Sequence, residues 1–99
     1  MTFIQTITFV TDQVDAVEAE MDQWVTSTAG VRTAQRATLA ADRDHPHSYV
    51  QIVEFPSYES AMENSRLAQT DEFADRLAKL CATPPVFQNL DVRRFDSLI

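Results

Sequence analysis

The sequence predicts an α+β domain of the ferredoxin-like type, in which the order βαββαβ forms a four-stranded antiparallel sheet with its helices on one face. The chain repeats one pattern, because residues 2–30 and 47–81 each read as a strand followed by a helix. A further strand pattern follows each copy, at about 31–42 and about 85–95. The shift that places Ile7 on Ile52 also places Ala16 on Ala61. Residues 1–99 are expected to form a single domain, because a second core would have nothing left to build it.

Residues 2–30 predict the first strand and the first helix. From Thr2 to Val10, odd-numbered side chains face one side and even-numbered side chains the other. Thr11 and Asp12 can cap the following helix, and Gly30, the only glycine, stands where a left-handed helix terminator belongs. The apolar stripe of this helix has the spacing of a helix packed on a sheet, and we assign it to the core: Val14, Val17, Met21, Trp24 and Val25.

Residues 31–55 predict two more strands joined by a turn. The second strand is expected over about 31–41, with Arg32 and Arg36 on one face. The polar segment 42–47 contains Pro46 and turns the chain. The third strand, about Ser48–Phe55, is the most hydrophobic, so we expect it in the centre of the sheet.

Residues 56–99 predict a two-part helical region and a last strand. Pro56 stops the third strand, and Ser57 can cap the helix that follows. Thr70 has the character of a second cap, which places a break or bend near residues 68–70. Two prolines at 84–85 end the helical region, a strand follows over about 86–95, and residues 96–99 form a short tail.

The first and third strands are apolar on both faces, although helices on one side leave the other side of such a sheet bare. A bare apolar face of several hundred Å² is about as large as monomers tolerate, so we expect a second copy of the chain to cover it. Apolar walls with a few polar groups are typical of a small-molecule pocket, and a filled core between two sheets is the alternative. The faces of the expected sheet also carry these polar residues: Gln51, Thr6, Thr8, Asn89, Asp91 and Arg36.

Charge and composition exclude several classes of partner. The formal net charge is −7, and no lysine or arginine precedes Arg32, so phosphate backbones and anionic membranes would be repelled. We therefore predict neither nucleic acid nor membrane as a partner. Cys81 is the only cysteine and is expected to be a small buried hydrophobe. The N-terminus enters a strand pattern directly, so we expect no signal peptide and a cytoplasmic protein.

The segment Tyr49–Leu67, followed by Glu72–Ala74, resembles the dimeric α+β barrel superfamily, and most of all the small antibiotic-biosynthesis-monooxygenase-like proteins. As topology, the resemblance covers nearly the whole chain. It implies a homodimer in which two four-stranded sheets form a dimeric α+β barrel. It also implies one of two activities, cofactor-independent oxygenation of polycyclic phenols or degradation of haem.

The chain departs from this family at three positions. Members of both kinds commonly place a tryptophan on the second helix, and the matching position here is close to Asn64. Haem-degrading members have a histidine later on that helix, where this chain has Arg76–Leu77, and an asparagine of the first strand is replaced by about Gln5. Haem iron needs an axial ligand, so haem degradation is the weaker implication.

The chain offers a short set of candidate site residues. We predict Asn64 and His47 as catalytic residues, because asparagine is a poor helix former and histidine can act as a base near neutral pH. Asn64 pointing to water and Arg36 paired with Glu54 or Asp91 are the alternatives. The ligand-binding candidates are Gln51, Arg36, Asn89, Thr6 and Thr8.

We predict no metal and no cofactor. His45 and His47, with Asp42 and Asp44, form the one metal-like cluster, but a solvated hairpin is favoured because a metal site needs three or four held ligands. A single glycine excludes the glycine-rich loops that bind nucleotides.

We expect one of two functions. The first is a homodimeric barrel that binds a small apolar or aromatic molecule, and the resemblance alone implies that it acts as a cofactor-independent monooxygenase of an aromatic metabolite. The second is a non-catalytic dimer that serves as a ligand-binding or accessory module. An enzyme would lose turnover on Asn64→Ala or His47→Ala while staying folded, whereas a binding module would be stabilised by ligand without forming product.

Overall fold

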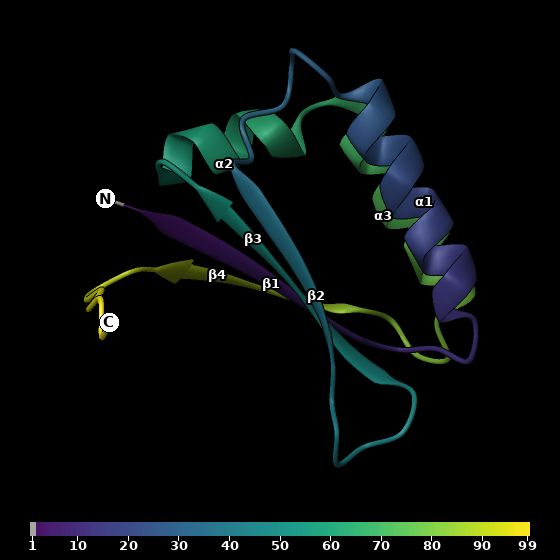
Figure 1. The fold of residues 1–99 in the computed structure, drawn as a ribbon. Helices are drawn as coiled ribbons and strands as arrows, with labels where there is room; N and C mark the ends of the chain where they lie inside the picture. Colours follow the sequence, from purple (N-terminus) through teal and green to yellow (C-terminus); the bar gives the residue numbers. More distant parts are fainter. Residues whose placement is uncertain (1) are drawn as a thin grey trace.

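The computed structural model describes residues 2–99 and has the predicted ferredoxin-like fold (Figure 1). Its strands pair in the order β2-β3-β1-β4, and every pairing is antiparallel. Figure 1 shows the helices gathered on one side of the sheet, with α1 and α3 next to each other. The elements are β1 (Phe3–Val10), α1 (Val14–Ser27), β2 (Arg36–Ala41), β3 (Ser48–Phe55), α2 (Tyr58–Ser65), α3 (Ala68–Leu80) and β4 (Val86–Asp91).

The strand register assigns every sheet residue to one of two faces. Ile7 lies opposite Gln51 on β3 and opposite Phe87 on β4, and Gln51 lies opposite Leu39 on β2. Odd-numbered residues therefore share the helix-covered face. The other face, which we call the open face, carries the even-numbered residues of all four strands, among them Ile4, Val50, Ile52, Val86 and Leu90.

Two predicted strands were too long. The second was expected from residue 31, but β2 begins at Arg36, because Thr33 leaves the sheet and bonds to α2. Its backbone N–H donates to Asn64 Oδ1 at 3.2 Å, and its hydroxyl donates to the Ser60 carbonyl at 2.5 Å. The last strand was expected to reach about 95, but β4 ends at Asp91, which pairs with the first residue of β1.

The helix boundaries follow from local capping. Ser57 caps α2 as predicted, because its hydroxyl accepts from the Ser60 N–H at 3.1 Å. Gly30 has a φ of 82°, the left-handed conformation expected of it, but α1 already ends at Ser27 with Thr28 as its C-cap, so Gly30 turns the chain after the helix rather than ending it. Thr70 was predicted to cap α3, but the helix begins at Ala68 after an extended Leu67, so Thr70 lies within its first turn. The break between the two helices therefore falls slightly earlier than predicted.

Thr11 joins the start of α1 to the end of α3. The Thr11 hydroxyl accepts from the Gln13 N–H at 3.0 Å and donates to the Leu80 carbonyl at 2.6 Å. The predicted cap therefore acts from two residues before the N-cap position, which is Gln13. This contact fixes the spacing between α1 and α3 at one end of the sheet.

The core under the helices consists of two separate clusters. Around Phe9, buried residues of β1, α1 and α3 pack together, with Val17 and Leu77 at their centre. Around Phe55, β1, β3 and α2 form a second cluster with Phe3 and Ala61. Gln5 and Gln51 lie between the two clusters on the same face of the sheet. No helix among residues 2–99 is both long and apolar enough to cross a membrane.

Candidate functional site

A cavity of about 240 Å³ lies between the helix-covered face of the sheet and the helices, where the two core clusters fail to meet. Its walls are mostly apolar and come from three strands and all three helices. We call it the sheet–helix cavity. Its lining residues are Gln5, Ile7, Met21, Trp24, Val25, Ala37, Leu39, Gln51, Val53, Phe55, Asn64, Thr70 and Phe73.

Two buried amide side chains enter this cavity from opposite walls. Gln51 comes from the central strand β3 and is 8% exposed, and Asn64 comes from the end of α2 and is 5% exposed. The Asn64 Oδ1 atom is held by the Thr33 N–H, which leaves its amino group as the donor that it can offer to a ligand. Apolar walls with a small number of placed polar groups are typical of ligand sites.

The indole of Trp24 forms the wall on the helix side. Its Nε1–H donates to Thr70 Oγ1 at 2.9 Å, which ties α1 to the first turn of α3. The guanidinium of Arg32 lies 5.9 Å from the centre of the same ring and donates to the Val25 carbonyl at 2.7 Å. Val25 and Ala37 line the cavity and are themselves exposed, so the opening lies between α1 and the edge strand β2.

No ionisable side chain is among the residues that line the sheet–helix cavity. The site can bind by shape, by apolar contact and through amide and hydroxyl groups, but it contains no general base or acid of its own. No histidine, cysteine or tyrosine lines it either. The cavity therefore does not fit haem, which needs an axial ligand and room for a four-ring macrocycle.

The structure brings together only some of the predicted site residues. Gln51 and Asn64 both line the cavity. Asn89 lies on the same face, at the exposed edge strand β4, and its Oδ1 accepts from Gln5 Nε2 at 3.2 Å. Asn89 thus contacts a cavity residue without lining the cavity.

Thr6, Thr8 and Arg36 lie on the open face, away from the sheet–helix cavity. The Thr6 hydroxyl donates to Gln88 Oε1 at 3.3 Å, and Arg36 pairs with Glu54 at 3.7 Å across β2 and β3. The pairing alternative for Arg36 is therefore the one present in the structure.

His47 lies at the far end of β3, roughly 13 Å from Gln51 at the ~3.3 Å rise of a strand residue. It adopts a φ of 66° in the turn, and its carbonyl accepts from the Thr11 N–H at 2.9 Å. Its surroundings form a second, more polar depression that includes Lys79 and Cys81. Cys81 is half-buried rather than fully buried as predicted, and it packs against the cluster around Phe9. Burial raises the pKa of its thiol, so the thiol stays protonated and behaves as a small hydrophobe.

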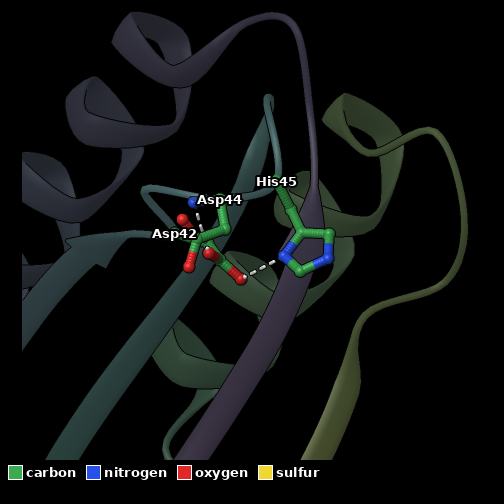
Figure 2. Close-up of polar contacts among 3 residues, drawn as sticks. All are labelled: Asp42, Asp44 and His45. Carbon is green, nitrogen blue, oxygen red and sulfur yellow. Dashed lines mark hydrogen bonds and ion pairs between the residues drawn. The ribbon is translucent and has the colours of Figure 1, made fainter.

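The metal-like cluster of the sequence forms the exposed hairpin between β2 and β3 (Figure 2). Asp42 accepts from the Asp44 N–H at 2.9 Å, and its other oxygen lies 3.0 Å from His45 Nδ1. The Asp44 N–H and then the His45 side chain hold the pKa of Asp42 below its ordinary value. Ionised Asp42 thus supports the turn, and this support is lost as the pH falls through its pKa. Among residues 2–99, no group of three or more histidine, cysteine, aspartate or glutamate side chains is placed so that it could hold a metal ion.

The apolar stripe of the first helix predicts Met21 and Trp24 as core residues, whereas the structure places both of them, together with Phe73, in the cavity wall. The available signal was the polar interruption of apolar strands, since Gln5 and Gln51 stand among phenylalanine, isoleucine and valine on one face. Two glutamines on the face toward the helices indicate that the core is not continuous there.

No protein-family model matches this chain, and no curated protein matches it in sequence. Solved structures do share its fold. Rv0793 from Mycobacterium tuberculosis has a TM-score of 0.79 at 15% identity, over 98% of this chain and 100% of that chain. An antibiotic biosynthesis monooxygenase has a TM-score of 0.73 at 15% identity, over 95% and 100%.

SnoaB from Streptomyces nogalater, a cofactor-independent oxygenase, is also similar. Its TM-score is 0.75 at 17% identity, over 95% of this chain and 94% of that chain. At these identities the likeness concerns the fold. It confirms, at that level, the resemblance to antibiotic-biosynthesis-monooxygenase-like proteins drawn from Tyr49–Leu67.

The Trp24–Thr70 hydrogen bond is expected to stabilise the cavity wall. Thr70→Val keeps the side-chain shape and leaves the half-buried Trp24 N–H without its acceptor, so the free energy of unfolding should fall by about 1 kcal/mol. Urea unfolding followed by Trp24 emission measures this directly, since Trp24 is the only tryptophan. Thr26→Val, at an exposed position of α1, is the matched control. Equal losses in the two variants would show that the hydrogen bond contributes nothing.

Proposed function

We propose that this chain is a homodimeric binding protein for a small, flat, apolar or aromatic molecule held in the sheet–helix cavity. The supporting observation is the divided core, which leaves an apolar cavity of about 240 Å³ with two buried amides in its walls. A continuous core would be the more stable arrangement, because empty space in a protein interior costs free energy. A ligand that fills the cavity restores those lost contacts.

The volume limits the size of this ligand. An engineered apolar cavity of about 150 Å³ in another protein binds benzene. The sheet–helix cavity, at about 240 Å³, has room for one or two rings. The side chains of Trp24, Phe55 and Phe73 supply aromatic walls that suit a flat partner.

Blocking the opening should abolish binding. Ala37→Phe places a large ring at the mouth between β2 and α1, and we expect it to weaken the affinity for indole or benzofuran by about tenfold or more through steric exclusion. Isothermal titration calorimetry of the wild type and the variant measures this. Ala41→Phe lies on the same strand and face outside the cavity, so it is the matched control. If no flat one- or two-ring compound binds the wild type, or if both variants bind alike, the proposed site is wrong.

The open face supports self-association. It presents half-buried Ile4, Val50 and Ile52 beside exposed Val86 and Leu90, with no helix over them. The segment after β4 adds exposed apolar side chains, because Phe95 is 85% and Leu98 is 92% exposed. Apolar surface of this extent is usually covered, and a second copy related by a twofold axis would cover both patches at once.

A charge at the centre of the open face should separate the proposed dimer. Val50→Glu places a carboxylate against the partner sheet, where it would be buried without a partner charge, so we expect a folded monomer. Size-exclusion chromatography with light scattering measures the mass, and circular dichroism checks the fold. Ala19→Glu adds the same charge on the exposed surface of α1 and should leave the mass unchanged. A wild-type monomer would contradict the dimer.

Cofactor-independent oxygenation is the second candidate function. It is supported by the fold shared with SnoaB and by Asn64 and Gln51, whose amide N–H groups could stabilise a developing oxyanion in a water-poor cavity. In such a reaction the substrate itself would supply the electrons that reduce dioxygen. No base lines the cavity, so none of its side chains would accept the proton that the substrate loses. Binding is therefore the function that the geometry supports best.

Dioxygen uptake separates the two functions. If the chain is an oxygenase, a dihydroxynaphthalene should consume dioxygen faster with the protein than without it, and Asn64→Ala should slow this about tenfold or more. Circular dichroism and urea unfolding of Asn64→Ala check that loss of the acceptor for the Thr33 N–H leaves the variant folded. His47→Ala, measured beside it, tests the histidine that the sequence predicts as catalytic and that lies outside the sheet–helix cavity. Binding without uptake above the uncatalysed rate would leave the binding module as the function.

A further inference from the structure

One polar atom in the wall of the sheet–helix cavity has no partner. Gln51 Oε1 is buried and forms no hydrogen bond within residues 2–99. The residues beside Gln51 on the neighbouring strands are Ile7 and Leu39, which offer no side-chain donor. A buried acceptor without a hydrogen bond destabilises a fold, so such atoms are rare and each one needs an explanation.

Several other polar groups of the cavity are engaged away from Gln51, whereas the Asn64 amino group remains a donor that a ligand can use. Gln5 Nε2 donates to Asn89, Trp24 Nε1 donates to Thr70, and Asn64 Oδ1 accepts from Thr33. None of these contacts reaches Gln51. No group among residues 2–99 bonds to this oxygen, so a molecule that enters the cavity can supply its partner. The terminal torsion of a glutamine side chain has broad preferences, so the amide can turn its oxygen toward such a molecule.

We propose that Gln51 is the specificity-determining residue of the cavity and selects an uncharged one- or two-ring molecule that donates an N–H or O–H hydrogen bond. This inference rests on the proposed function, namely that the cavity holds a ligand. A ligand with this donor satisfies Gln51, whereas one without it leaves the buried oxygen unpaired. A site built to accept a hydrogen bond discriminates strongly against ligands that cannot donate one.

The same walls select for an uncharged ligand. No cation lines the cavity, so a bound carboxylate or phosphate would be desolvated without compensation. A ligand anion would also face the partial negative charge of Gln51 Oε1. Arg32 is the cation that packs on Trp24, but it is not part of the lining and donates to the Val25 carbonyl and the Thr28 hydroxyl.

Indole and benzofuran test the donor directly, because the two molecules have nearly the same shape and differ in an N–H replaced by an oxygen. We expect calorimetry to show that the wild type binds indole about tenfold or more tightly than benzofuran. Gln51→Leu should bring the two affinities together. Gln23→Leu, the same substitution at an exposed position of α1, should keep the wild-type preference.

The melting temperature of the free protein provides a second test that does not depend on the shape of the cavity, which Gln51→Leu could alter. Leucine removes the unpaired oxygen and packs against Ile7 and Leu39, so the melting temperature of the free protein should rise in this variant and not in Gln23→Leu. A fall in the melting temperature would show that Gln51 is already satisfied, and the inference would be wrong.

The remaining outcomes separate this inference from the proposed function. Equal binding of indole and benzofuran to the wild type, abolished by Ala37→Phe, would keep the cavity as a ligand site and overturn the role of Gln51. Tighter binding of an indole carboxylate than of indole would overturn the selection for uncharged ligands and assign Arg32 a part in recognition. If neither molecule binds and no other flat compound does, the proposed function fails and this inference fails with it.

Discussion

The helix-covered face of the sheet carries two glutamines where a continuous core would need apolar side chains, and the rest of the architecture depends on this. Gln5 and Gln51 are diagonal neighbours on the two central strands, with phenylalanine on both sides of them along β1. The helices cannot close over these amides as they close over Phe9 and Phe55. The core therefore divides into two clusters, and the cavity is the space between them.

The break in the second helical region follows from the same division. α2 covers the cluster around Phe55, whereas α3 packs with α1 over the cluster around Phe9, so one straight helix could not serve both. Asn64 lies at the end of α2, just before the break, where its side chain can hold Thr33 and still face the cavity. The irregular segment before β2 is thus attached to the same helix end that forms part of the site.

Much of the fold could be predicted from the sequence, because its strands and helices have the apolar residue spacing typical of each. Alternation located β3 at Ser48–Phe55, and the Ser57 cap located the start of α2. The start of β2 could not be predicted, because residues 31–35 have strand character and are drawn away by long-range hydrogen bonds from Thr33. β4 ends where β1 has no more residues to pair, which is a property of the register rather than of residues 92–95.

The site was harder to predict than the fold, because a list of polar strand residues does not say which face each one occupies. Gln51 and Thr6 lie on adjacent strands, yet the register places the first toward the helices and the second on the open face. Nor does the sequence show that His47 and Asn64 lie at different ends of the sheet. His47 directly precedes β3, whereas Asn64 lies on α2, the helix that follows β3. A one-residue difference in register changes the face, so this information exists only once the strands are paired.

The two faces of the sheet therefore have different chemistry and support different proposals. The open face is mostly apolar, and two of its polar pairs, Arg36 with Glu54 and Thr6 with Gln88, bond within the face. The helix-covered face keeps an unpaired acceptor at Gln51 inside a cavity without charge. Covering paired polar groups costs less than covering unpaired ones, although the Arg36–Glu54 pair must still lose its water, whereas a buried group that lacks a partner is best explained by a ligand that supplies one.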